Sequence, residues 1–407
     1  MAGAVSAREA RRRVHGAGEI AFLDIRDAGP HAAGHPLLAV PCPVGRFDAD
    51  LRWLVPRRSC PVLLVDGGDG TAARAADRMS AFGYGDVCWI DGGVQGWADA
   101  GYTLYEGVNV PSKTLGELLD VEWRVPRIRA DALADWQSEN RAFHLFDGRP
   151  VDEFSRTTIP GARNAPNGEL VHRADEYISD GAPVVVCCAG RTRSIIGAAS
   201  VALAGFRQPV YALENGTRGW LLSGRHLMRD AGVQALPLLG AQALQASRAR
   251  ARDLIRQRGL SCIEAGNVAP MQAEPGRTTF LIDVRSHEEF AAGSLAGAVH
   301  APFVQLVQAS DRFIGVRRAR LVLVDDTGLR AALAAVFLQA MNFEVHLLIG
   351  AEMSAVPTRI NGRTSPPPLP QDDSPDAARR YLAWETGLVG RLDAEERAEF
   401  RIGPSPF

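Results

Sequence analysis

The sequence predicts an α/β protein made of three tandem copies of one doubly wound, parallel-sheet domain, followed by a C-terminal helical tail. Three observations support this. A short apolar strand that runs into Asp-x-Arg occurs three times, each occurrence is followed by a second apolar strand and an alanine-rich helix, and the spacing between copies is nearly constant. Strands that alternate with helices imply crossover connections, and crossovers build a mostly parallel sheet.

Each copy opens with the strand that carries Asp-x-Arg, at residues 22–26, 145–149 and 281–285. A turn with small residues follows, at residues 34–36, 159–162 and 295–298. The second apolar strand is expected at residues 61–65, 183–187 and 320–324. A third is expected at residues 87–90, 210–213 and 345–348.

The helix between the second and third strands ends in the same way in every copy. Gly83, Gly205 and Asn342 stand at that end, and each is followed by an aromatic residue. Glycine and asparagine tolerate the left-handed conformation just beyond a helix C-terminus, where the next apolar side chain packs back on the last turn. We therefore expect a helix C-cap at all three positions.

The spacing defines the domain boundaries. The same 123 residues separate Asp24 from Asp147 and Trp97 from Trp220, while Asp147 and Asp283 are 136 apart. The predicted division is a first domain at 1–105, a linker at 106–126, a second domain at 127–230, a helical linker at 231–276, a third domain at 277–355, and a Pro-rich linker with helical tail at 356–407.

The tail has an apolar stripe at helical spacing between residues 377 and 400. Its members are Tyr381, Leu382, Trp384 and Leu388. Such a stripe buries itself against another surface. We expect it to pack either on the core of its own chain or on a second copy, which would make a homodimer.

Composition narrows the function. Of the 407 residues 46% are hydrophobic and 23% are charged, as in ordinary globular proteins. The 45 basic and 47 acidic side chains leave a formal charge of −2, which argues against a nucleic-acid partner. No apolar run is long enough to cross a membrane, and the Arg-rich start does not resemble a secretory signal, so a cytoplasmic location is expected. Lys113 is the single lysine, which is typical of GC-rich coding DNA.

The six cysteines do not form a C-x-x-C pair, so no metal site and no cofactor is expected. Their importance lies in one loop. In an open parallel sheet, ligands bind beyond the carboxyl ends of the strands. The loop after the second strand begins there with Asp66 in the first copy and Asp325 in the third, whereas the second copy has Cys188, Ala189, Gly190, Arg191, Thr192, Arg193 and Ser194.

Cys188 is therefore the candidate nucleophile. A helix N-terminus and neighbouring arginines favour a thiolate, and the small residues after Cys188 let backbone N–H groups turn inward around an anion. Cys187, at the last strand position, is expected to point into the core, as is Cys88. Asp66 and Asp325 are expected to cap the helices that follow them.

The ordered set of motifs resembles the tandem rhodanese-type sulfurtransferases over residues 7–350. The resemblance rests on Asp-x-Arg, the turn at 159–162, the loop from Cys188 to Ser194, and the Gly-Trp pairs that end at Trp97 and Trp220. It implies that Cys188 is catalytic and that residues 189–193 line the sulfur-binding cradle. The first and third copies lack the cysteine, and the third also lacks Gly-Trp, so both resemble inactive rhodanese domains.

The resemblance further implies a double displacement. The Cys188 thiolate would take sulfur from a small anionic donor such as thiosulfate, and the persulfide would pass it to cyanide, a thiol or an acceptor protein. Arg191 and Arg193 would attract the anionic donor. Asp147 and Arg149, at the end of the neighbouring strand, are expected to pair and support the cleft.

Two other functions fit parts of the pattern. A cysteine phosphatase or arsenate reductase of related fold needs an arginine six residues after its cysteine, and that position holds Ser194. A non-enzymatic sulfur carrier or interaction scaffold would explain why two of the three copies lack the nucleophile. Turnover of thiosulfate with cyanide separates the enzyme from the scaffold.

Overall fold

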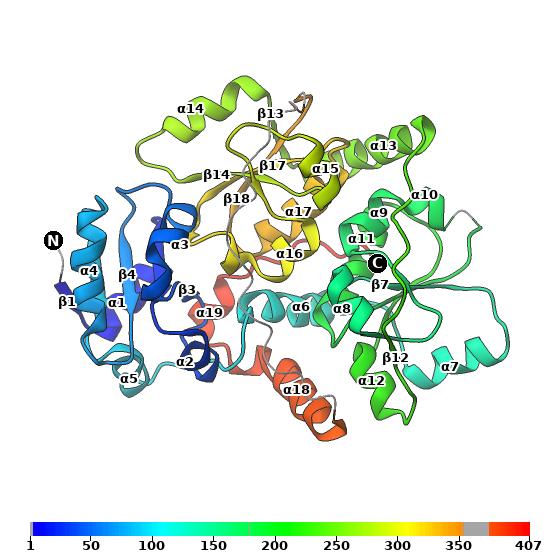
Figure 1. Cartoon of the computed structure of the whole chain (residues 1–407), viewed down its shortest axis with the longest axis horizontal. Helices are drawn as coiled ribbons and strands as arrows, with labels where there is room; N and C mark the ends of the chain where they lie inside the picture. Colours follow the sequence, from blue (N-terminus) through cyan, green and yellow to red (C-terminus); the bar gives the residue numbers. More distant parts are fainter. Residues whose placement is uncertain (1–2, 179, 352, 354–373) are drawn as a thin grey trace.

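The computed structural model describes residues 3–178, 180–351, 353 and 374–407. Each of the three copies forms its own open sheet. In Figure 1 the first copy (blue) lies at the left, the second (cyan to green) at the right and the third (yellow to orange) at the top, while helix α18 (Pro375–Gly387) of the tail runs along the lower side. The predicted fold class is confirmed.

The three sheets share one strand order. Within each copy, neighbouring strands of that order pair in parallel. The first is β1-β5-β4-β2, with β3 beside β2: β1 (Gly3–Val5), β2 (Ile20–Asp24), β3 (Val40–Pro41), β4 (Val62–Val65) and β5 (Val87–Ile90). The second is β6-β11-β10-β7-β9: β6 (Arg127–Ile128), β7 (His144–Asp147), β9 (Arg163–Asn164), β10 (Val184–Cys187) and β11 (Val210–Leu213). The third is β13-β18-β17-β14-β15: β13 (Ser261–Ile263), β14 (Thr279–Asp283), β15 (Val299–His300), β17 (Arg320–Val324) and β18 (Glu344–Leu348). A separate antiparallel pair joins β8 (Thr157–Thr158) to β12 (Met228–Arg229).

Helices cover the sheets. The first copy has α1 (Ala7–His15), α2 (Ala28–Ala33), α3 (Phe47–Leu54), α4 (Thr71–Ala81) and α5 (Gly93–Asp99). The second has α7 (Ala130–Ser138), α8 (Val151–Arg156), α9 (Asn167–His172), α10 (Ala174–Tyr177), α11 (Thr192–Leu203) and α12 (Gly216–Leu222). The third has α14 (Val268–Ala273), α15 (His287–Ala292), α16 (Phe303–Gln308) and α17 (Leu329–Ala340). Outside the copies lie α6 (Val110–Trp123), α13 (Ala241–Arg258), α18 (Pro375–Gly387) and α19 (Ala394–Ala398).

The predicted helix C-caps are confirmed by the backbone. Gly83, Gly205 and Asn342 have φ angles of 91°, 79° and 66°. These values lie in the left-handed region that ends a helix. The repeat therefore follows from local chemistry that each copy carries in its own sequence.

The Asp-x-Arg motif forms the same ion pair in every copy. The arginine Nη2 lies 2.6 Å from a carboxylate oxygen of the aspartate in Asp24–Arg26, Asp147–Arg149 and Asp283–Arg285. The same nitrogen also donates to a carbonyl eight residues further along. Because the Cys-less copies keep this arrangement, it supports the fold at the end of the first strand.

The copies are joined by a common core, which the sequence did not predict. One cluster of buried apolar side chains runs through all three copies, α6 and the tail. In addition, β16 (Val316–Arg317) of the third copy pairs antiparallel with β2 of the first, where Val316 lies opposite Ala21. The third copy thus completes part of the edge of the first sheet.

The segments outside the copies are more structured than linkers. Residues 106–126 contain α6, a 14-residue helix that is mostly buried. The tail forms α18 and α19 instead of one continuous helix. Leu382 and Leu388 are buried against their own chain, so the chain's own core covers the apolar stripe. Among the residues that the structure describes, no helix combines the length and apolar character that a membrane crossing requires.

Candidate functional site

Cys188 lies in the loop between β10 and α11. Its side chain is 1% exposed, and its Sγ lies 3.7 Å from the hydroxyl of Ser194, which itself donates to the carbonyl of Arg191. Cys187, one residue earlier, is fully buried in a core cluster of the second copy. Burial raises the pKa of the Cys187 thiol well above its ordinary value. The expected core positions of Cys187 and Cys88 are confirmed.

The equivalent loops of the other copies have an aspartate at this position. An Asp66 oxygen accepts a hydrogen bond of 2.8 Å from the backbone N–H of Ala72, and an Asp325 oxygen accepts one of 2.9 Å from that of Arg330. Ala72 and Arg330 are each the second residue of the helix that follows. Both aspartates therefore bond to the start of the following helix, as expected, although Gly70 and Gly328 occupy the N-cap positions themselves. At this place in the fold, two copies hold a negative charge against the start of a helix, and the second copy has Cys188.

The turn between β11 and α12 supports the Cys188 backbone. The N–H of Thr217 donates to the carbonyl of Cys188 over 2.7 Å. Gly216 has a φ of 54°, and a Cβ there would lie 2.1 Å from the same carbonyl oxygen. The Asn-Gly before Gly-Trp is therefore needed because only glycine allows the two backbones to approach this closely.

Arg191 is bound by two carboxylates of α6. Its Nε lies 2.7 Å from Glu117, and its Nη2 lies 2.7 Å from Asp120. A third, longer contact of 3.4 Å joins it to the amide oxygen of Asn215. Burial raises the pKa of Glu117 to about 7, since the hydrogen bond and charge of Arg191 offset it only in part. The segment expected as a linker therefore fixes one end of the Cys188 loop.

Arg193 makes a two-pronged ion pair with Glu153 of α8, at 2.6 and 2.8 Å. Burial disfavours the Glu153 carboxylate, but the charge and hydrogen bonds of Arg193 outweigh it and lower its pKa to about 2. Both arginines of the loop, expected to attract an anionic donor, are thus already bonded to carboxylates of their own chain.

The structure brings the rest of the predicted loop together. The carbonyl of Ala189 accepts from the backbone N–H of Arg218 at 3.3 Å, and the hydroxyl of Thr192 donates to Glu385 at 2.8 Å. Asp147 lies opposite Cys187 in the sheet and pairs with Arg149. That pair supports the strand end beneath the loop, as expected.

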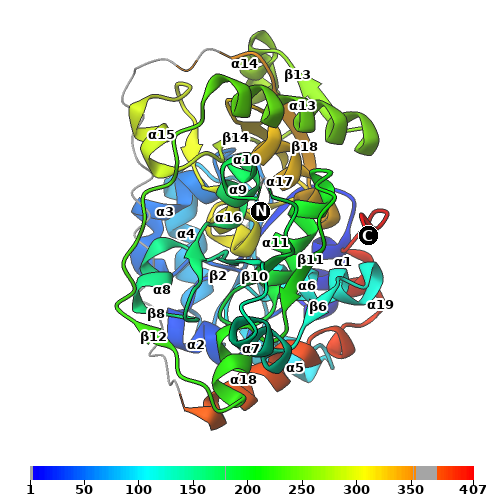
Figure 2. The same ribbon diagram turned by 90° about the vertical axis from the view of Figure 1, so that its right-hand side faces the viewer.

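The tail helix α18 covers this loop, which the sequence did not predict. A Cβ on Gly190 would lie 2.7 Å from Glu385 Oε2 and 2.8 Å from Tyr381 Cε1. The hydroxyl of Tyr381 accepts a hydrogen bond of 2.9 Å from Lys113 of α6. Figures 1 and 2 both show α18 beside α12, next to the second copy. The single lysine and the apolar stripe of the tail are the sequence features that belong to this contact, but neither feature identifies the segment that it packs against.

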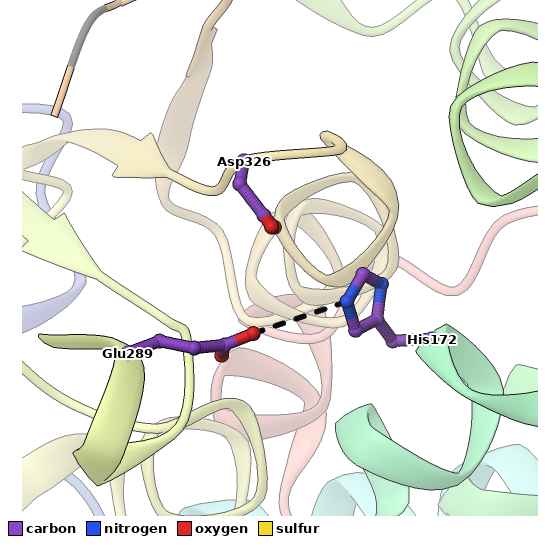
Figure 3. A group of neighbouring side chains, drawn as sticks. All are labelled: His172, Glu289 and Asp326. Carbon is purple, nitrogen blue, oxygen red and sulfur yellow. Dashed lines mark ion pairs between the residues drawn. The ribbon is translucent and has the colours of Figure 1, made fainter. Parts of the chain in front are cut away.

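A second polar cluster lies between the second and third copies, beside a cavity of about 800 Å³. His172, Glu289 and Asp326 each offer a ligand atom within 4.8 Å of the others (Figure 3). His172 Nε2 lies 4.0 Å from Glu289. However, the Arg330 guanidinium is 2.6 Å from Glu289 and 2.7 Å from Asp326. Because a buried cation already pairs with both carboxylates, the cluster is an ion-pair junction between copies and fits a metal ion poorly.

These features define a class of protein: tandem α/β domains in which the loop between a strand end and a helix start carries an aspartate in two copies and a cysteine in the third. Comparison with family models specifies the class. The model of the rhodanese-like domain matches residues 6–100, 129–223 and 266–351, more than half of the chain. The chain belongs to the rhodanese-like family.

Known proteins with similar sequences or structures agree. The crystal structure of thiosulfate sulfurtransferase from Pseudomonas aeruginosa superposes with a TM-score of 0.85 at 38% identity, over 90% of this chain and 69% of that one. A putative sulfur carrier protein, YrkF of Bacillus subtilis, is 27% identical over 96 residues, which cover 24% of this chain. The match spans about half (51%) of that curated relative.

Proposed function

We propose that this chain is a sulfurtransferase that moves a sulfane sulfur from a donor such as thiosulfate to a thiophilic acceptor through a persulfide on Cys188. One observation carries the proposal. Where the first and third copies hold the carboxylates of Asp66 and Asp325 against helix-start N–H groups, the second copy has a cysteine. A thiolate or persulfide at that position would be stabilised by the same N–H groups.

The proposed reaction has two displacements. The Cys188 thiolate attacks the outer sulfur of thiosulfate, the sulfur–sulfur bond of the donor breaks, and sulfite leaves with the bonding electron pair. The acceptor, cyanide in an assay and a thiol or protein in the cell, then attacks the terminal sulfur of the persulfide and restores the thiolate. Sulfur moves formally as a neutral atom, so no external oxidant is needed.

Arg191 and Arg193 have a modified role in this proposal. Each is paired with carboxylates, so its net contribution to attracting a donor is reduced. We assign to them the rigid placement of the loop, whose N–H groups meet the sulfur anion. The thiosulfate sulfurtransferase that this chain resembles over most of its length supports the reaction class.

The second candidate is a sulfur-carrying scaffold. It is favoured by the absence of the nucleophile from two copies and by the relative named a putative sulfur carrier protein. In this alternative Cys188 stores sulfur and the other copies contact partners.

Turnover of thiosulfate with cyanide distinguishes the two, with Cys188→Ser as the test variant and Cys187→Ser as the matched neighbour. We expect thiocyanate from the parent protein, no thiocyanate from Cys188→Ser, and most of the activity in Cys187→Ser. Equal loss in both variants contradicts the assignment of roles. A stable gain of one sulfur atom on Cys188 without thiocyanate formation supports the scaffold, and hydrolysis of an aryl phosphate that depends on Cys188 would favour the phosphatase.

A further inference from the structure

We propose that Lys113 and Tyr381, which lie outside all three rhodanese-like domains, form the subsite that binds the anionic end of the sulfur donor at the Cys188 loop. This inference rests on the proposed function for the identity of the donor. It assigns donor recognition to two segments that sequence analysis treated as a linker and a tail, and it gives the chain's single lysine a role.

The first step is the distribution of charge around the loop. Arg191 is paired with Glu117 and Asp120, and Arg193 with Glu153. Lys113 differs from them. Among the residues that the structure describes, the neutral hydroxyl of Tyr381 is the one hydrogen-bond partner of its ammonium. An ammonium has three N–H donors, so two remain for an acceptor from outside.

The surroundings of Lys113 keep it charged. Its ammonium lies 5.1 Å from the ring centres of both Tyr381 and Trp384, a distance at which aromatic faces attract cations. Burial opposes the charged form, but Tyr381 and the nearby Glu385 outweigh it and raise the pKa of Lys113. Lys113 as a residue is intermediate in exposure. Among the described carboxylates none forms an ion pair with its ammonium, and Glu385 acts on it as a nearby charge.

The second step is position. On α6, a Cβ at Gly116 would lie 2.8 Å from Thr192 of the loop, so the helix turn after Lys113 rests directly on the loop. On α18, Tyr381 lies against Gly190, two residues after Cys188. Both helices therefore contact the loop that begins at Cys188, α6 at Thr192 and α18 at Gly190. The ammonium and the phenol thus belong to the wall of the Cys188 site.

The chemistry of the donor fits this wall. Thiosulfate carries its charge on a sulfonate end with several oxygen acceptors and presents its outer sulfur at the other end. An ammonium and a phenol hydroxyl are both donors to such oxygens, and hydrogen bonds to charged groups are the stronger kind. The guanidinium of Arg218, 3.8 Å from the centre of the Tyr381 ring, adds positive charge beside the phenol.

The variant that tests this is Lys113→Met, with Lys113→Arg as the conservative replacement. The matched control is Arg379→Gln, which removes a cation from an exposed face of α18. Loss of one charge-assisted hydrogen bond predicts that KM for thiosulfate rises about tenfold or more, with kcat within a factor of about two. We expect the KM for an uncharged thiol acceptor, dithiothreitol, to stay unchanged, Lys113→Arg to recover most of the loss, and Arg379→Gln to match the parent. An equal rise in KM for thiosulfate and for dithiothreitol, or no rise for thiosulfate, would overturn the inference.

A binding measurement separates this inference from the proposed function. Thiosulfate is titrated calorimetrically into Cys188→Ser protein with and without Lys113→Met, after thermal melts show that both are folded. A loss of affinity of about tenfold or more on removing Lys113 supports the subsite even where thiocyanate is never formed. Equal affinity in both proteins, or no binding in either, rejects the subsite even where the turnover assay succeeds.

Discussion

The ion pair between Glu153 and Arg193 allows a quantitative prediction for Glu153→Gln. The pair is mostly buried, with 22% of the Glu153 side chain and 10% of the Arg193 side chain exposed. The pKa of Glu153 is about 2 in the folded chain, against an ordinary value of 4.5. That difference of about 2.5 units, at 1.36 kcal/mol each, corresponds to about 3 kcal/mol of stability at pH 7.

The pH dependence has a definite sign. Because folding lowers this pKa, the stabilisation is fully present above pH 4.5 and is lost as the pH falls through about 2. The difference in unfolding free energy between the parent and Glu153→Gln should therefore be about 3 kcal/mol at pH 7 and less than half of that at pH 3. The other carboxylates are common to both proteins and cancel in the difference.

Urea unfolding of both proteins at pH 7 and pH 3, followed by fluorescence, measures this difference. Glu139→Gln, at the exposed end of α7, is the control and should change stability by less than about 0.5 kcal/mol at either pH. A destabilisation by Glu153→Gln that is the same at both pH values would refute the linkage between the ion pair and stability. A loss below about 1 kcal/mol at pH 7 would refute the calculated magnitude.

Three further predictions concern neighbouring contacts. Burial raises the pKa of Glu117 to about 7, so the stability that its protonated side chain contributes is fully present below pH 4.5 and is lost as the pH rises through 7. The melting temperature of Glu117→Gln should therefore fall less between pH 5 and pH 8 than that of the parent. An identical fall in both proteins would contradict this. Asp325→Asn should destabilise the chain by about 3 kcal/mol in urea, because it leaves the fully buried Arg330 with one carboxylate fewer, whereas an effect below about 1 kcal/mol would contradict the pairing. Gly190→Ala should displace α18, because the added Cβ would lie 2.7 Å from Glu385. Iodoacetamide should then alkylate Cys188 several-fold faster. An unchanged rate would show that α18 does not limit the access of the reagent to Cys188.

The repeated fold could be predicted because each copy carries its own local signals. Asp24, Asp147 and Asp283 each form the same ion pair with an arginine two residues later, and this requires nothing from other copies. Helix caps such as Gly83 and Asn342 are equally local. The place of Cys188 at a strand end followed from the same reasoning, because a strand, a loop and a helix are contiguous in sequence.

The contacts around the loop could not be predicted, because they join distant segments. Helical periodicity showed that residues 377–400 have an apolar face, but an apolar face does not identify the surface that covers it. It also did not show that Glu385, a polar member of α18, bonds to Thr192. Similarly, no local feature links Arg191 to Glu117, 74 residues earlier. The sequence therefore predicted the candidate nucleophile and the helical character of both segments, but not the contacts that α6 and α18 make with the Cys188 loop.

The pairing of β16 with β2 has a consequence for how the chain folds as it is made. β16 covers Ile20 and Ala21 at the edge of the first sheet, while β3 covers Leu23 and Asp24 further along the same strand. During synthesis the first copy emerges well before residues 316–317, so part of this edge must wait with unpaired backbone groups. An uncovered strand edge is a site where chains pair wrongly with one another. A protein truncated before β16 should therefore aggregate more readily than the full chain, although its first copy is intact in sequence.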